Sequence, residues 1–368
     1  MTARVAARIT QVVAQAAAQE RAPVTFRHVY LTIQGLPGSR CVFTEVIGVP
    51  VSKTGLLDMY RTMVRIRIFE EDVYSEWKAG GVPGQVHLYS GEEAVAAGVI
   101  AHLNVDDYVV STHRGHGHVL AKGADTKKMM AEVFGRVDGY CQGKGGTMHM
   151  ADSERGILGT NGIVGASLPI ATGVGVKCQL AGRGQVCVCF FGDGASNRGT
   201  FHESLDLASV WNLPVIYVCE NNSYAMSTHV NEHTCCEQIA DRAVGYGMPG
   251  VAVDGNDIQA VYEAAGVAIE RARNGGGPYL LECMTWRHHG HFTADPAYYR
   301  DPEEHAERLK TDPIARCQNF LLAEGLATAA ELDRIQTEVV AEMDEALDFA
   351  RNSPWPDEDQ VATGVYSE

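Results

Sequence analysis

The chain has 368 residues, 45% of them hydrophobic, which is enough to bury a sizeable core. Its formal net charge of −16 argues against a nucleic-acid-binding protein or one that binds an anionic membrane surface. No apolar stretch is long enough for a transmembrane helix. The ten cysteines are scattered, several of them in apolar stretches, which is typical of buried reduced thiols rather than of a disulfide framework. We therefore expect a cytoplasmic protein.

The first 50 residues differ in composition from the rest of the chain. Residues 1–21 are rich in Ala, Gln and Arg, as transit peptides are, but no serine occurs before Ser39. We interpret residues 1–50 as a non-catalytic N-terminal extension. The alternative is a targeting signal, which would place the protein in the mitochondrial matrix.

Apolar residues at helical spacing begin at Leu56 and predict a helix that ends near Gly80. Helices and strands then alternate along the chain. Further helices are expected at 92–102, 125–134, 168–180, 201–211 and 257–273, and strands at 108–110, 186–191, 213–219, 251–253 and 279–286. Residues 135–165 are glycine-rich and are expected to form a loop. A capping box at Thr328 and Glu331 begins a C-terminal helix.

This alternation predicts an α/β fold with a doubly wound, mainly parallel sheet and a helical C-terminal tail. We expect one domain over residues 51–350, followed by a tail at 351–368.

Two of the predicted strands end in polar residues that suit a metal ion. Residues 186–191 lead into the Gly-Asp-Gly motif at 192–194, and residues 213–219 lead into Asn221-Asn222. A helix that connects two neighbouring strands implies a right-handed crossover and strands that run parallel. Parallel strands have their carboxyl ends at the same edge of the sheet, which is where ligands bind. The oxygens of Asp193 and Asn222 can then reach one point, and such oxygens suit Mg²⁺.

These two motifs, together with their flanks, resemble the thiamine-diphosphate signature of cofactor-dependent dehydrogenases. Residues 192–199 and 220–224 resemble the alpha subunit of the first component of 2-oxo acid and acetoin dehydrogenase complexes, and the resemblance runs from about Leu56 to Phe349. It implies thiamine diphosphate and Mg²⁺ as cofactors. The metal ligands would be Asp193, Asn222 and the backbone carbonyl of Tyr224, and the neighbouring cofactor contacts would be Gly194 and Ala195.

A second polar segment, residues 111–118, follows the short strand at 108–110 and contains three histidines around Arg114. A zinc site is disfavoured, because the arginine would repel a cation and prefers phosphate. The resemblance implies that Arg114 binds the diphosphate of the cofactor, beside a cofactor contact at His113. Pyruvate-type members usually carry Tyr at the position of His113, and the amino-acid sequence of this segment is more similar to that of acetoin dehydrogenases. We interpret His116 and His118 as structural.

The resemblance assigns roles to four more residues. His291 corresponds to a histidine that contacts the diphosphate, and we expect it to be both cofactor-binding and catalytic. His87 would face the substrate as a catalytic acid or base, although a histidine between Val86 and Leu88 also suits a core. The backbone at Gly162 and Val164 would support the aminopyrimidine side of the cofactor.

Other enzyme classes are disfavoured by missing motifs. The stretch Gly-Lys-Gly-Gly at 143–146 lacks the spacing and the Ser or Thr of a phosphate loop, which argues against a nucleotide triphosphatase. A nicotinamide-dependent enzyme would need G-x-G-x-x-G after an early strand, and none is found there. A non-catalytic acidic scaffold would not need the two motifs together with Arg114 and His291.

The resemblance implies an oxidoreductase that acts on an oxo group with a disulfide acceptor, lipoamide. We predict that acetoin is cleaved to acetaldehyde and that the remaining two-carbon unit passes to lipoamide as acetyl. The alternatives are the alpha subunit of pyruvate dehydrogenase, which would decarboxylate pyruvate, and that of a branched-chain 2-oxo acid dehydrogenase. No motif is present for the glutamate that activates the cofactor. We therefore expect a beta subunit to provide it in an α2β2 heterotetramer that works with a lipoyl acyltransferase.

Overall fold

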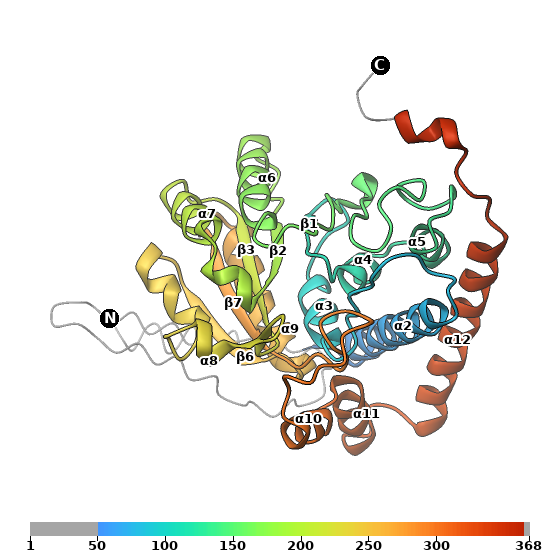
Figure 1. The fold of residues 1–368 in the computed structure, drawn as a ribbon. Helices are drawn as coiled ribbons and strands as arrows, with labels where there is room; N and C mark the ends of the chain where they lie inside the picture. The colour runs from blue at the N-terminus through green and yellow to red at the C-terminus, as the bar shows by residue number, and fades with distance from the viewer. Residues whose placement is uncertain (1–50, 364–368) are drawn as a thin grey trace, which may run out of the picture.

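The computed structural model describes residues 51–363. The predicted extension at 1–50, with its possible targeting signal, and the end of the predicted tail at 364–368 lie outside the described residues. The described chain has a sheet layer on one side and a helical layer on the other, as Figure 1 shows. Within residues 51–363, no helix has the length and apolar content needed to cross a membrane.

The sheet is parallel and five-stranded, with the order β1-β2-β3-β7-β6. Its strands are β1 (Tyr108–Val110), β2 (Cys187–Gly192), β3 (Val215–Asn221), β6 (Gly250–Asp254) and β7 (Tyr279–Met284). All five predicted strands are therefore present, and β2 and β3 pair in parallel as the crossover argument requires. A separate two-stranded hairpin, β4 (Tyr224–Ala225) and β5 (Thr228–His229), follows β3 directly.

Helices cover both faces of the sheet, which confirms the doubly wound architecture. One face packs on α3 (Glu93–Ile100) and α9 (Ile258–Arg273), and the other packs on α6 (Ser167–Ala181), α7 (Gly199–Val210) and the 3-10 helix η3 (Ile239–Tyr246). Successive residues of β2 and β3 point to opposite faces, and both sets are buried. This burial on both faces explains why the two strands have continuous apolar sequences.

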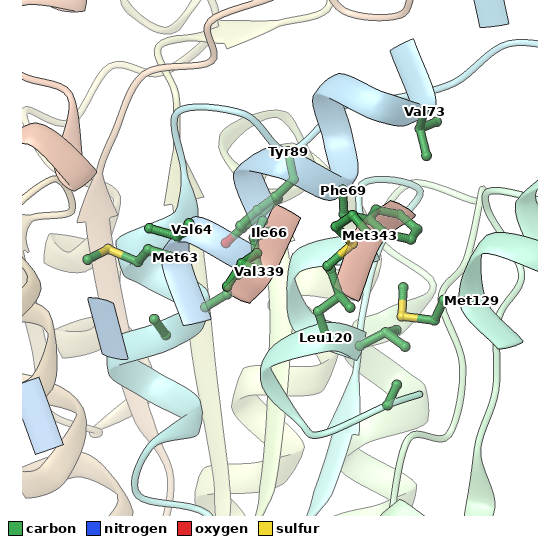
Figure 2. Close-up of a cluster of buried hydrophobic side chains, with 14 of the residues drawn as sticks. Met63, Val64, Ile66, Phe69, Val73, Tyr89, Leu120, Met129, Val339 and Met343 are labelled. Carbon is green, nitrogen blue, oxygen red and sulfur yellow. The ribbon is translucent and has the colours of Figure 1, made fainter. Parts of the chain in front are cut away.

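The helical layer forms a core of its own. Its helices are α2 (Lys53–Lys78), α4 (His116–Ala121), α5 (Thr126–Val133), α10 (Pro302–Leu309), α11 (Pro313–Ala323) and α12 (Ala329–Asn352). The short α8 (Val230–His233) lies elsewhere, directly after β5, which it contacts. Figure 2 shows Met63 and Phe69 of α2 near Val339 and Met343 of α12, and all four side chains are fully buried.

The C-terminal helix is part of this core and not an appended tail. The predicted capping box is present, since Glu331 N donates to Thr328 Oγ1 at 3.2 Å and Thr328 N donates to Glu331 Oε2 at 2.8 Å. The helix α12 packs along α5 and α2. Only the segment after Asn352, which contains the 3-10 helix η4 (Glu358–Ala362), extends beyond it.

The glycine-rich loop at 135–165 contains one short 3-10 helix, η1 (Ser153–Arg155). Its backbone is organised by the buried carboxylate of Glu132. This carboxylate accepts four backbone hydrogen bonds, from Cys141, Gly143, Gly145 and Gly146, at 2.7–3.0 Å. The amides of the Gly-Lys-Gly-Gly stretch therefore bind an internal carboxylate, which agrees with the prediction that the stretch is not a phosphate loop.

Candidate active site

The predicted metal ligands follow two adjacent strands at the carboxyl edge of the sheet. Gly192, the last residue of β2, pairs with Glu220 near the end of β3. Asp193 begins the 3-10 helix η2 (Asp193–Asn197), and Asn222 follows β3 directly. Both side chains are buried, with exposed fractions of 2% and 7%. Their place at this edge agrees with the position expected from the sequence.

Asp193 is held by a histidine that the sequence reasoning missed. His233 Nε2 lies 3.1 Å from Asp193 Oδ2. The histidine is fixed in turn by Asn197 of η2, whose Nδ2 donates to the backbone oxygen of His233 at 2.7 Å. The sequence offered no signal for this contact, because no pattern in it places His233 beside η2.

The other two predicted metal ligands converge on one positive charge. Arg287 Nη1 lies 3.5 Å from Asn222 Oδ1 and 3.4 Å from the backbone oxygen of Tyr224. Arg287 is 1% exposed, and its Nη2 donates to the hydroxyl of Tyr299 at 3.2 Å. Two uncharged oxygens from different residues therefore face a single cationic group, as ligands of a hard cation would.

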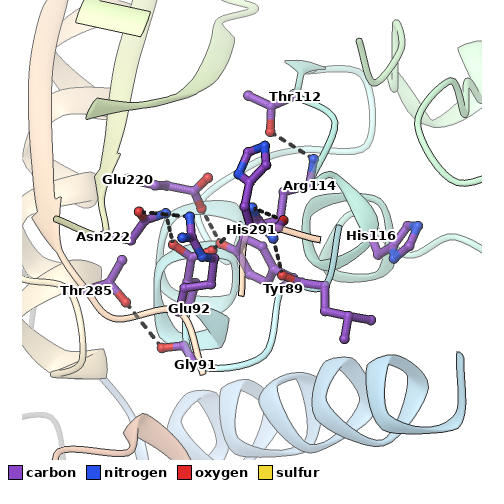
Figure 3. A network of polar contacts seen from close by, with 12 residues as sticks. Tyr89, Gly91, Glu92, Thr112, Arg114, His116, Glu220, Asn222, Thr285 and His291 are labelled. Carbon is purple, nitrogen blue, oxygen red and sulfur yellow. Dashed lines mark hydrogen bonds and ion pairs between the residues drawn. The ribbon is translucent and has the colours of Figure 1, made fainter. Parts of the chain in front are cut away.

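Arg114 ties two segments of the site together. Its Nη1 donates to the backbone oxygen of Leu88 at 2.6 Å, and its Nη2 donates to that of His291 at 3.0 Å. Its Nε lies 3.6 Å from Glu92 Oε2. Figure 3 shows Arg114 and His291 close together above Tyr89 and Glu92. The structure thus brings together Arg114 and His291, which are far apart in the sequence.

Three predicted site histidines form one cluster beside Arg114. The ring centroid of His87 lies 4.7 Å from that of His113 and 5.0 Å from that of His291. The cluster therefore unites the expected acid or base at His87 with two of the expected cofactor contacts. Neither His87 Nδ1 nor His291 Nδ1, both buried, has a hydrogen-bond partner in the described residues.

All three imidazoles are uncharged at neutral pH. Burial, followed by the charge of Arg114, lowers the pKa of His87 to about 4, that of His113 to about 2 and that of His291 to about 3. One nitrogen from each ring lies within 4.8 Å of the others, a spacing that a transition metal could use. The guanidinium groups of Arg114 and Arg287 oppose a cation there, so the cluster suits an anionic or polar ligand better.

The remaining two histidines of the 111–118 segment have internal partners, as expected for structural residues. His118 Nε2 lies 2.9 Å from Glu220 Oε1, and its Nδ1 lies 2.8 Å from Ser111 Oγ. His116 Nδ1 lies 3.1 Å from Glu70 on α2. Both histidines are fully buried and connect the short helix α4 to its surroundings.

The remaining predicted contacts surround this centre. Gly194 and the buried Ala195 lie in η2 beside Asp193. A side chain at Gly194 would meet Ala225 Cβ at 2.7 Å, so the hairpin after β3 packs directly on this glycine. Gly162 and Val164 lie in the loop before α6, and Val164 is 48% exposed. Within residues 51–363, no hydrogen bond or ion pair joins these two residues to Arg114 or Asp193, so their cofactor role stays a prediction.

The donor set at this edge fits a metal-bound diphosphate. Asp193 offers a carboxylate, and Asn222 and Tyr224 offer carbonyl oxygens, which are ligands that Mg²⁺ prefers. Arg114 and Arg287 provide positive charge suited to phosphate oxygens. His87 Nδ1 and His291 Nδ1, which have no hydrogen-bond partner within residues 51–363, could contact a ligand. A strongly acidic chain therefore has a local site for an anion.

Comparison with known proteins shows the family of the chain. A family model described as the dehydrogenase E1 component matches residues 61–358. The chain is 50% identical over 320 residues to the alpha subunit of acetoin:2,6-dichlorophenolindophenol oxidoreductase from Bacillus subtilis, covering 87% of this chain and 96% of that one. It is 48% identical to the same subunit from Cupriavidus necator, covering 86% and 96%.

A pyruvate dehydrogenase E1 component alpha subunit from Rhizobium meliloti is 41% identical over 315 residues, covering 85% of this chain and 90% of that one. The family match covers all five strands of the sheet and every predicted site residue from His87 to His291. The chain belongs to the dehydrogenase E1 component family and is an oxidoreductase alpha subunit, and this family implies thiamine diphosphate as cofactor.

Proposed function

We propose that this chain is the alpha subunit of a thiamine-diphosphate- and Mg²⁺-dependent acetoin dehydrogenase. The observation that carries the metal assignment is the convergence of Asn222 Oδ1 and the Tyr224 carbonyl on one cationic group, beside Asp193 at the same sheet edge. Thiamine diphosphate would supply the carbanion chemistry that cleaves the bond next to a carbonyl. The chain would bind and orient its diphosphate through Arg114, His113 and His291, with Gly194 and Ala195 beside the metal.

The proposed substrate is acetoin, cleaved to acetaldehyde and an acetyl group that passes to lipoamide. Two relatives named for acetoin are 50% and 48% identical to the chain, whereas the pyruvate dehydrogenase subunit from Rhizobium meliloti is 41% identical. Pyruvate, and less directly a branched 2-oxo acid, are the alternatives. His113 also supports acetoin, because it stands in the cluster with His87 and His291, where a tyrosine is expected in pyruvate-type members.

Within this reaction, the chain's own residues would position the reactants and move protons. His87 is uncharged at neutral pH, and its buried Nδ1 has no hydrogen-bond partner in the described residues, so it can accept a proton from the substrate. Arg114 and Arg287 hold positive charge near the anionic part of the cofactor. Backbone oxygens would keep both groups in place, those of Leu88 and His291 for Arg114 and that of Tyr224 for Arg287.

The proposed partner is a beta subunit in an α2β2 heterotetramer, which would supply the glutamate that activates the cofactor. Large apolar side chains are exposed on α6, at the end of α7 and in the loop before α6, as expected of a subunit interface. These side chains are Ile163, Val164, Ile170, Leu180, Val210 and Trp211. A lipoyl acyltransferase would accept the acetyl group. The buried free thiols of the sheet support a reducing compartment, for which we propose the cytoplasm.

Co-expression with a beta subunit tests this proposal. The purified complex should reduce 2,6-dichlorophenolindophenol with acetoin when thiamine diphosphate and Mg²⁺ are present, and more slowly with pyruvate or branched 2-oxo acids. Asp193→Ala should abolish Mg²⁺-dependent binding of thiamine diphosphate in calorimetry. Asp206→Asn, at an exposed position on α7, is the matched control and should bind as the wild type does.

Three outcomes would contradict separate parts of the proposal. Unchanged cofactor affinity in Asp193→Ala would remove the metal-ligand assignment. Faster turnover of pyruvate than of acetoin would favour the pyruvate alternative. Rapid turnover by the single chain without a beta subunit would refute the divided active site.

A further inference from the structure

Glu92 is a buried carboxylate between two residues that the proposed function assigns to the cofactor. It is fully buried. Its Oε1 accepts a hydrogen bond from Asn222 Nδ2 at 2.9 Å, and its Oε2 lies 3.6 Å from Arg114 Nε (Figure 3). It therefore contacts one residue that follows β3 and one that follows β1.

The side chain of Glu92 does not serve the helix that it precedes. Glu92 is the N-cap residue of α3, where a side chain usually accepts a hydrogen bond from the first turn, but it makes no such bond. Oε2 has no hydrogen-bond partner in the described residues, although burying a carboxylate is costly without partners. The carboxylate thus contacts the site and does not cap the first turn of α3.

The bond to Asn222 fixes which way its amide points. An amide has one donating and one accepting end, so holding Nδ2 at Glu92 turns Oδ1 to the opposite side. On that side Oδ1 faces Arg287 Nη1 and the backbone N–H of Tyr224. Without Glu92 the amide could rotate and present Nδ2, which cannot bind a cation.

Glu92 acts on Arg114 by its charge. The guanidinium of Arg114 is 4% exposed and also lies close to the charge of Arg287, which opposes it. The Glu92 carboxylate at 3.6 Å offsets that repulsion and holds Nε while the two Nη groups donate to Leu88 and His291.

We propose that Glu92 is a positioning residue that orients Asn222 for the metal ion and holds Arg114 for the diphosphate. This inference rests on the proposed function. Groups that orient metal ligands typically change affinity by 10- to 100-fold when removed. One carboxylate would therefore couple the metal half and the phosphate half of the same site.

Two substitutions separate the two contacts. In Glu92→Gln the amide oxygen can still accept from Asn222 Nδ2, but the charge facing Arg114 is lost. In Glu92→Ala both contacts are lost. Glu93→Gln is the matched control, since Glu93 is the next residue and equally buried, but its carboxylate binds Arg67, at 2.5 and 3.0 Å, outside the site.

The experiment uses calorimetry on the complex with the beta subunit. The Kd of Mg²⁺ is measured at saturating thiamine diphosphate, and the Kd of thiamine diphosphate at saturating Mg²⁺. Glu92→Ala should weaken both by about 10- to 100-fold. Glu92→Gln should weaken thiamine diphosphate by about the same factor but keep the Mg²⁺ affinity within about threefold of wild type, a partial rescue that a general loss of structure would not give. Glu93→Gln should change neither Kd, whatever its effect on Tm.

Wild-type affinities in Glu92→Gln would overturn the contact with Arg114. If Glu92→Gln and Glu93→Gln lost affinity for Mg²⁺ and thiamine diphosphate equally, and these losses followed the fall in Tm, the positioning role would be overturned. Glu92 would then have only a structural role. If the wild-type complex bound no thiamine diphosphate, the proposed function itself would fail, which is a result distinct from either of these.

Discussion

Glu132→Gln is the substitution whose effect the structure specifies most closely. The carboxylate is fully buried and accepts four backbone N–H groups of the glycine-rich loop, two on each oxygen. Glutamine has nearly the same shape, so no cavity forms. Its NH2 group replaces one carboxylate oxygen, however, and this group cannot accept hydrogen bonds from the two backbone N–H groups that it faces.

The cost follows from the number of bonds lost. A hydrogen bond to a charged group contributes about 1.5–3 kcal/mol, so losing two costs about 3–6 kcal/mol. The remaining two bonds also weaken, because their acceptor is no longer charged. Domains are stable by only about 5–15 kcal/mol, so we expect a large fall in the free energy of unfolding.

Hydrogen exchange and thermal melting measure this effect. The amides of Cys141, Gly143, Gly145 and Gly146 should exchange at least about 100-fold faster in Glu132→Gln, and Tm should fall by at least about 5 °C. Glu345→Gln is the control, because its surface ion pair with Lys127 at 3.0 Å contributes at most about 1 kcal/mol. Similar Tm values and exchange rates in both variants would refute the assignment of the loop to this carboxylate.

Three further outcomes are expected. His113→Tyr should lower the ratio of kcat/KM for acetoin to that for pyruvate by about tenfold or more, equivalent to about 1.4 kcal/mol, and an unchanged ratio with cofactor bound would exclude His113 as a determinant of specificity. Gly194→Ala should lower the free energy of unfolding by about 1–3 kcal/mol, since the new Cβ meets Ala225 Cβ at 2.7 Å, and a wild-type denaturation midpoint would contradict this. Because the folded pKa of His113 is about 2, below its ordinary value, the unfolded chain binds a proton below pH 6.5 that the folded chain does not. The contribution of His113 to the free energy of unfolding is therefore present above pH 6.5 and lost as pH falls toward 2, and the loss reaches about 2.5 kcal/mol at pH 4.5. Between pH 6.5 and pH 4.5, the free energy of unfolding measured by denaturation should therefore fall less in His113→Gln than in the wild type.

The sheet could be predicted from sequence because its signal is local. Each strand of the buried sheet reads as a short apolar stretch, and glycines or polar residues mark where it ends. The short helix α4 was missed, since its six residues, two of them histidines and one a glycine, are too few to show an apolar period. The helices α10 and α11 were also missed. Asp301 and Asp312 cap them, each followed by Pro, so a local signal was present at both.

The site could be predicted only in part, for a physical reason. Asp193 and Asn222 follow adjacent strands, so strand order alone brought them to one edge. The contacts of His233 and Glu92 depend on how segments distant in the sequence pack on one another, which no local pattern encodes. Glu92 was especially hidden, because the sequence placed it at the start of the predicted helix at 92–102, where an acidic residue is common.

The electrostatics of the site are compatible with both proposed roles of its residues, binding an anion and transferring protons. Burial keeps His87, His113 and His291 uncharged, and the charges of Arg114 and Arg287 reinforce that state. If the imidazoles carried charge, they could not accept a proton at neutral pH. Because they do not, the positive charge at the site comes from the guanidinium groups, and the neutral histidines would be available for the proposed proton transfer. These separate roles require the arginines to lie close to the histidines. Arg114 does so, because its Nη2 donates to the backbone oxygen of His291.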